Sequence, residues 1–179
     1  MMKLFLFILG FSIQGSTWAQ KNLVASDDGS KIHFVIKNFG IKTSGDISGL
    51  EANIKFDPND VSVWIFDATV NASTINTDNS SRDSHLKKSE YFDVTKYPTF
   101  HILSSKIETT DKRGVMKFIG TLTIKGVTKQ LQFPFKVNTY KGGYLFTGSF
   151  EINRRDFNVG ESSIALADNL KVSLSVLAK

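Results

Sequence analysis

The sequence contains no cysteine, which excludes disulfide bonds, thiol nucleophiles and cysteine-bound metal sites. It also lacks any segment beyond its first residues that is apolar enough to span a membrane as a helix, which takes about 20 residues. The net charge is +5, but the basic residues are scattered along the chain. A nucleic-acid partner is therefore not expected, because nucleic acid favours a concentrated basic stripe.

The first 19 residues have the layout of a secretory signal peptide. A short positive start ends at Lys3, the apolar run Leu4 to Ile13 follows, and the small residues Thr17 and Ala19 precede the expected cleavage point. We therefore expect residues 1–19 to be a signal peptide and residues 20–179 to be one exported domain, periplasmic or extracellular. An uncleaved signal anchor is the alternative.

Alternation of apolar and polar residues dominates the rest of the chain, and this period of two predicts half-buried strands. Each alternating row puts its apolar side chains on one face of a strand. The clearest rows are Ile32, Phe34 and Ile36; Leu131, Phe133, Phe135 and Val137; Tyr144, Phe146, Gly148, Phe150 and Ile152; and Leu170, Val172, Leu174 and Val176. Residues 118–124 form a similar row.

Turn signals separate these rows. The segments Asp57–Asp60, Asp111–Gly114, Lys125-Gly126 and Lys141–Gly143 are typical of hairpin connections. Many strands joined by short turns indicate an antiparallel sandwich or barrel.

Two places depart from simple alternation. The apolar parity changes near Gly49-Leu50, which predicts a bulge or sharp bend. Residues 61–70 carry apolar side chains on both faces, as Trp64 and Ile65 illustrate. That pattern predicts a strand covered on both sides.

The segment Thr77 to Tyr97 is polar and breaks the strand pattern. Its Asx and Ser residues predict a capped short helix near Ser80 to Lys88. Apolar residues would hold this helical insertion against the barrel as a candidate lid: Leu86, Tyr91, Phe92 and Val94. Pro98 ends the segment before the next expected strand.

Enzymatic motifs are missing. Asp83-Ser84-His85 has the residue types of a catalytic triad, but consecutive side chains point in different directions and cannot form the relay. The histidines, at 33, 85 and 101, are not at metal-ligand spacing. No nucleotide-binding fingerprint occurs. We therefore expect no enzymatic activity, no cofactor and no metal.

Three groups of residues carry a resemblance to a known family. The first is Ser73–Thr77 followed by Arg82–Leu86, Tyr91–Val94 and Tyr97-Pro98; the second is Gly120–Lys129; the third is Asn153–Val159. Because the three groups occur in this order and at these separations, the chain resembles the YceI-like family of exported proteins that bind lipids or polyisoprenoids. The family often has Phe at position 91 and Gly at position 158. Asn158 tolerates the left-handed backbone that Gly would allow.

The resemblance implies an all-β, lipocalin-like antiparallel barrel of about eight strands with a short helical insertion. It also implies that the lumen holds an amphiphile with a long tail. We expect the ligand to contact the inward row, namely Phe34, Ile36, Ile47, Phe100, Phe118, Gly120, Leu122, Phe133, Phe135, Phe146, Gly148, Phe150 and Leu174. Gly45, Gly120 and Gly148 have inward parity and would leave room for it.

The expected partner is a long-chain apolar lipid of the polyprenyl, quinone or fatty amide type. Ligand affinity grows by about 0.3 kcal/mol per heavy atom, which favours a long tail. The head group would lie near Arg82 and His85. Transient membrane contact and a homodimer are both compatible with the sequence.

For the lumen and for the polar residues near its ends, a purely structural role is the alternative to ligand binding. The many phenylalanines could fill the barrel, which would then be a plugged, non-enzymatic interaction or stress-protective module. Asp83 could cap the helix or pair with Arg82 or Arg155, and His85 could bond to backbone. Arg155 and Asp156 could form an ion pair that closes one end of the barrel.

Overall fold

A computed structural model describes residues 21–179, and the signal peptide expected at residues 1–19 lies outside this part of the chain. The described chain is built almost wholly of strands. The strands are β1 (Lys21–Ala25), β2 (Lys31–Asn38), β3 (Ile41–Ile47), β4 (Glu51–Phe56), β5 (Ile65–Asn71), β6 (Thr99–Thr109), β7 (Val115–Ile124), β8 (Val127–Tyr140), β9 (Gly143–Asn153) and β10 (Leu166–Ala178). The helical elements are α1 (Ser80–Leu86) and the 3₁₀ turns η1 (Val61–Val63), η2 (Ala72–Thr74) and η3 (Arg154–Phe157).

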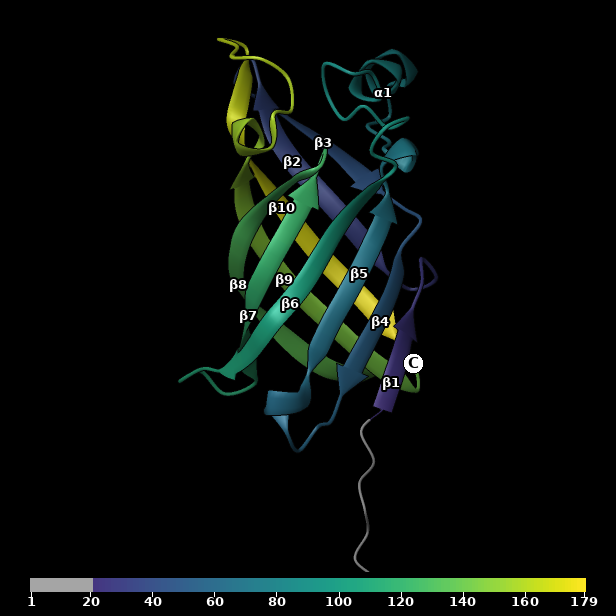
Figure 1. The fold of residues 1–179 in the computed structure, drawn as a ribbon, viewed down its shortest axis with the longest axis vertical. Coiled ribbons are helices and arrows are strands. Elements are labelled where there is room, and N and C mark those ends of the chain that lie inside the picture. The colour runs from purple at the N-terminus through teal and green to yellow at the C-terminus, as the bar shows by residue number, and fades with distance from the viewer. Residues whose placement is uncertain (1–20) are drawn as a thin grey trace, which may run out of the picture.

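The strands close into an antiparallel barrel. They follow the order β1-β4-β5-β6-β7-β8-β9-β10-β2-β3, and β1 also pairs with β10 through Ala25 and Ala178. β1 and β2 lie end to end along one edge of β10, with β4 and β3 beside them. The ten segments therefore occupy the eight positions of a closed barrel, which confirms the predicted architecture (Figure 1).

Two neighbouring positions of the barrel are each occupied by two shorter strands, β1 with β2 and β3 with β4, and the two breaks lie next to each other. β3 ends and β4 begins around Gly49, whose φ of +73° bends the backbone. The Asp27 carboxylate, from the loop between β1 and β2, accepts hydrogen bonds from the N–H groups of Gly49 and Leu50 at 2.8 and 2.9 Å. The bend predicted near Gly49-Leu50 is confirmed, and a single carboxylate joins both breaks.

Tight hairpin turns have the backbone that their sequences predict. Lys125 and Gly126 both have positive φ, as do Lys141 and Gly142, which is the geometry of type I′ turns. The turn Phe39-Gly40 between β2 and β3 has the same geometry, with φ of +49° and +76°. The turn signals missed it because phenylalanine is unusual at such a position.

The prediction of a strand covered on both faces over residues 61–70 is wrong. The strand, β5, begins only at Ile65, and its outer face is exposed. Val61–Val63 forms the 3₁₀ turn η1, because the Asp60 side chain accepts a hydrogen bond from the Ser62 N–H. Trp64 points into the core, and its indole N–H donates to the Asp57 carbonyl at 2.6 Å. Ile65 is 40% exposed on the outer face.

The polar insertion forms the predicted helix and packs on one end of the barrel. Asn79 caps α1 by accepting a hydrogen bond from the Arg82 N–H. Tyr91, Phe92 and Val94 pack against the core, and the Phe92 ring lies 4.9 Å from that of Phe100. Figure 1 shows α1, the β2–β3 turn and the segment before β10 at the same end of the barrel.

Candidate functional site

The half of the barrel beneath α1 contains a cavity of about 1060 Å³. Inward rows of two neighbouring strands form much of its wall: Ile32, Phe34 and Ile36 of β2, and Leu170, Val172 and Leu174 of β10. Exposed side chains also line it, among them His85, Lys88 and Ser163, so the cavity reaches solvent at the α1 end. The cavity therefore has mainly apolar walls and a polar opening at the α1 end.

The other half of the barrel is filled by aromatic rings. Phe56 lies 4.5 Å from Trp64 and 4.4 Å from Tyr144, centroid to centroid. Phe66 is surrounded by Phe135 and Phe146 at 5.5 and 5.2 Å. These tilted and edge-on contacts are the arrangements that aromatic rings prefer in a packed core. The barrel is therefore hollow at one end and solid at the other.

The residues expected in the lumen divide between these halves. Seven of them line the cavity: Phe34, Ile36, Ile47, Phe100, Leu122, Phe150 and Leu174. Phe118, Phe133, Phe135 and Phe146 are buried among other aromatic rings and do not line it. The structure brings the first set together at a hollow and assigns the second set to the core.

The inward glycines do not leave space for a ligand, which corrects that part of the sequence argument. A Cβ at Gly120 would lie 2.1 Å from the Leu103 carbonyl oxygen, and one at Gly148 would lie 2.9 Å from the Phe133 ring. A Cβ at Gly45 would meet the Phe34 ring at 2.6 Å. These glycines are needed so that neighbouring backbone and phenylalanine rings can approach closely.

Arg82 and His85 both lie at the mouth of the cavity, on α1. The Arg82 guanidinium donates to the side-chain and backbone oxygens of Thr77 at 2.7 and 2.6 Å. Asp83 accepts a hydrogen bond from the Thr77 N–H at 2.9 Å and is not the helix cap, which is Asn79. The His85 ring packs edge-on against Tyr91 with centroids 4.9 Å apart.

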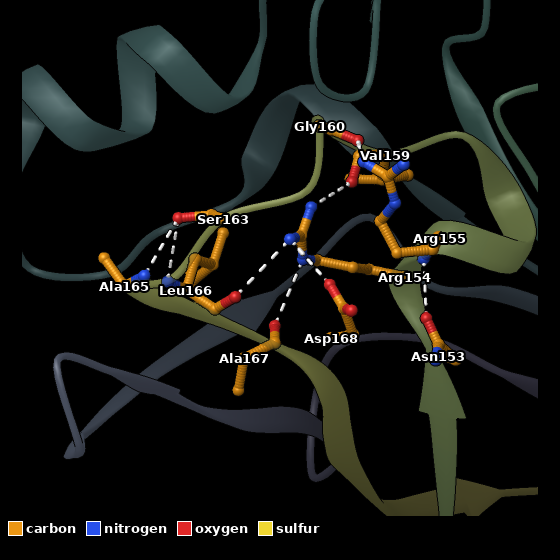
Figure 2. Close-up of polar contacts among 10 residues, drawn as sticks. All are labelled: Asn153, Arg154, Arg155, Val159, Gly160, Ser163, Ala165, Leu166, Ala167 and Asp168. Atoms are coloured by element: carbon orange, nitrogen blue, oxygen red, sulfur yellow. Dashed lines mark hydrogen bonds and ion pairs between the residues drawn. The ribbon is translucent and has the colours of Figure 1, made fainter.

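A buried cation that the sequence analysis missed also lines the cavity. Arg154 is 4% exposed, and its guanidinium donates to the carbonyls of Val159 and Ala167 at 2.8 and 3.1 Å (Figure 2). It also lies 2.7 Å from a carboxylate oxygen of Asp168. Arg155 donates to the Gly160 carbonyl. The ion pair at this end is thus Arg154–Asp168, not the expected Arg155–Asp156.

Strand parity could have located Arg154. The inward row of β9 runs through Tyr144, Phe146, Gly148, Phe150 and Ile152, and the next residue of that parity is Arg154. The short turn η3 begins there and keeps the side chain pointing inward. Without the tertiary structure, the carbonyls that surround the guanidinium could not be identified.

Neither a metal-binding cluster nor a membrane-spanning helix is found in the described part of the chain. Residues 21–179 contain no cluster of three or more His, Asp or Glu side chains able to hold a metal ion. No helix among these residues is both long enough and apolar enough to cross a bilayer.

Comparisons with known proteins place the chain in a family. The family model for the YceI-like domain matches residues 24–178. A UPF0312 protein of Staphylococcus aureus (strain MSSA476) is 28% identical over 140 residues, which cover 73% of this chain and 77% of that protein.

Two solved structures share the fold. Burkholderia cenocepacia BcnA superposes with a TM-score of 0.81 at 24% identity, over 86% of this chain and 99% of BcnA. A polyisoprenoid-binding domain from Saccharophagus degradans, implicated in plant cell wall breakdown, superposes with a TM-score of 0.71 at 12% identity, over 89% of this chain and 99% of that domain. Because the family model covers nearly all of the barrel that the structure describes, the chain belongs to the YceI-like family.

Proposed function

We propose that this protein binds one amphiphile with a long apolar tail in the hollow half of its barrel and carries out no chemistry on it. The observation that supports this most directly is the cavity of about 1060 Å³ with apolar walls and a polar mouth. A hydrocarbon tail gains free energy by leaving water for such walls. The likeness to a polyisoprenoid-binding domain supports the same ligand class.

The cavity volume limits the length of the tail. At about 30 Å³ per water-sized group, 1060 Å³ holds on the order of 35 groups. A tail of about 20 to 35 heavy atoms, at about 0.3 kcal/mol each, would give roughly 6 to 10 kcal/mol. That corresponds to dissociation constants from tens of micromolar down to tens of nanomolar. A longer tail would extend through the mouth.

The head group would lie at the mouth, where Arg82, His85 and Lys88 line the cavity. The phosphate of a prenyl phosphate, a quinone ring and the amide of a fatty amide all fit this description. We further propose that the protein is exported and carries or shields its lipid outside the cytoplasm. The alternative of a plugged, interaction-only barrel would need the hollow half to be closed by a partner rather than a ligand.

A blocking variant tests the proposal. Val172→Trp places a large ring in the cavity wall, and we expect it to reduce uptake of a fluorescent long-chain prenyl alcohol at least tenfold. The matched control is Ser173→Trp, because successive residues of β10 point to opposite faces of the wall. The control should bind the probe like the unmodified protein.

Melting temperatures without the probe show that both variants remain folded. Equal uptake by Val172→Trp and the unmodified protein would overturn luminal binding. So would native mass spectrometry in which the purified protein neither carries nor accepts an apolar molecule.

A further inference from the structure

Three large apolar side chains project into solvent at the mouth end of the barrel. Phe39, Ile41 and Ile164 are 77%, 71% and 107% exposed, the highest values among large apolar residues of the described chain. Because Asn38 pairs with Ile41 on one side and with Leu166 on the other, the three lie close together. The Phe39 N–H also donates to the Ala165 carbonyl at 2.7 Å. We refer to Phe39, Ile41 and Ile164 as the apolar tip.

The backbone at the apolar tip does not favour the residue that it carries. Phe39 has a φ of +49° at the first position of a type I′ turn, where Asn or Asp before Gly is preferred. A bulky side chain with positive φ is energetically unfavourable and buries nothing here. Folding therefore gives no reason for phenylalanine at this position, which suggests that it serves an interaction.

The loop that presents Ile164 is held firmly although its tip is exposed. Arg154 donates to the Val159 carbonyl on one side of the loop and to Ala167 on the other, and the Ser163 hydroxyl accepts the N–H groups of Ala165 and Leu166 (Figure 2). Ile164 is thus presented by a preorganised loop, and its exposure is a fixed feature of the fold.

Charge around the apolar tip is mainly positive. Lys37 and Lys42 are directly paired across β2 and β3, and both are exposed. The hairpin segment 37–42 contains no acidic residue; the facing loop and strand contribute Glu161 and Asp168, and Asp168 is paired with Arg154. Lys88, at the mouth, is also exposed. Apolar side chains between lysines are the arrangement that lipid interfaces with anionic head groups attract.

We propose that the apolar tip inserts into the interface of an anionic lipid bilayer, with Lys37 and Lys42 contacting the head groups, so that the cavity mouth faces the membrane. The tip is convex, and three side chains are too few for a typical protein interface of about 800 Å² per partner. A soft bilayer accepts separate protruding side chains without a complementary surface. The proposal goes beyond luminal binding and can be tested without any luminal ligand.

The test is flotation of the exported protein with vesicles of phosphatidylcholine alone or of equimolar phosphatidylcholine and phosphatidylglycerol. Phe39→Asn relieves the strained turn and removes one apolar contact, so we expect it to weaken vesicle binding about tenfold while the melting temperature stays equal or rises. Ile164→Ser should weaken binding similarly. Lys37→Gln with Lys42→Gln should reduce binding only to the phosphatidylglycerol vesicles, and added salt should mimic it.

The control variants are Ile65→Ser and Leu103→Ser, apolar positions on the barrel wall that are 40% and 38% exposed. They should bind vesicles like the unmodified protein. Vesicle binding that is absent in the unmodified protein, or lost equally in the wall variants, would overturn the proposal. So would a dimer in sedimentation that Phe39→Asn dissociates, because a second copy would then cover the tip.

Luminal lipid binding and membrane insertion of the apolar tip can be disproved independently of each other. Val172→Trp should still float with vesicles although its cavity is blocked, and Phe39→Asn should still take up the prenyl probe from detergent solution. If Phe39→Asn loses uptake from detergent as well, the tip acts on the ligand itself and the membrane proposal is wrong.

Discussion

At the residue scale, Arg154 shows how a charge can be buried in a mostly apolar barrel. Its guanidinium is surrounded by carbonyl oxygens of Val159 and Ala167 and by the Asp168 carboxylate. A buried charge is costly unless it is paired and hydrogen-bonded, and these contacts supply both conditions. The planar guanidinium reaches several acceptors at once, which a lysine ammonium cannot do with the same geometry. Arg154 therefore fixes the loop that forms one side of the mouth.

We predict that Arg154→Met lowers the free energy of unfolding by about 2–4 kcal/mol, because it leaves buried carbonyls and a partly buried carboxylate without partners. Urea denaturation measures this change. Arg155→Met is the control, since the Arg155 side chain is exposed and donates only to the Gly160 carbonyl; its effect should stay below about 1 kcal/mol. Similar values for the two variants would contradict a special role for Arg154.

At the scale of elements, the β2–β3 hairpin is attached to the barrel mainly along one edge. β2 pairs with β10 over much of its length, whereas the outer edge of β3 has a single bridge, between Asp46 and Asn76. The Asp46 side chain adds cross-strand contacts to His33 at 2.6 Å and to Lys31 at 3.3 Å. Asp46 thus links the hairpin to itself through its side chain and to Asn76, directly before the insertion, through its backbone.

This contact makes the hairpin's contribution to stability depend on pH. Partial burial raises the pKa of Asp46, but hydrogen bonds from His33 and Lys31 outweigh it and hold the pKa below the ordinary value of 3.8. A carboxylate with a lowered pKa in the folded state stabilises the fold above its unfolded pKa. That contribution is lost as the pH falls through the folded pKa.

We therefore predict that Asp46→Asn destabilises the protein at neutral pH and that the difference from the unmodified protein shrinks as the pH falls below 3.8. Urea titrations over a pH series measure it. Asp46 is half exposed, so solvent reduces the effect and its direction is the test. A difference that grew as the pH fell below 3.8 would have the wrong sign.

At the scale of the whole molecule, the barrel separates stability from binding. The aromatic half, with Phe56, Trp64, Phe66, Phe135 and Phe146, provides a dense core. The half beneath α1 keeps a cavity that its wall residues border on one side. A domain without disulfides needs tight packing somewhere, and filling one end allows the other to stay hollow.

The two halves should respond differently to truncation. Phe135→Ala removes a buried ring from close contact with its neighbours, and we predict a loss of about 3–5 kcal/mol in unfolding free energy. Ile36→Ala removes a side chain that already borders a cavity, so its loss should be no more than about 2 kcal/mol. Equal losses in denaturation experiments would mean that the hollow half is as tightly packed as the other.

Much of the architecture could be predicted from local patterns. Alternation located β2, β7, β8, β9 and β10, the Lys-Gly turns located two hairpins, and the parity change located the bend at Gly49, because each depends on neighbouring residues only. Asn158 takes the left-handed backbone, with φ of +55°, which asparagine tolerates. Local patterns failed where Val61–Val63 forms a turn, because the Asp60 cap outweighs the apolar alternation there.

The sequence by itself determined which side chains of the alternating strands face inward and the place of the helical insertion, whereas the number of strand positions was an expectation from the family resemblance. Only the tertiary structure decided which inward phenylalanines fill the barrel and which line a cavity. Parity gives the direction of a side chain but not its depth along the barrel axis. Depth depends on the register between strands that are distant in sequence, which also brings Arg154 to Asp168 and Phe39 to the loop of Ile164.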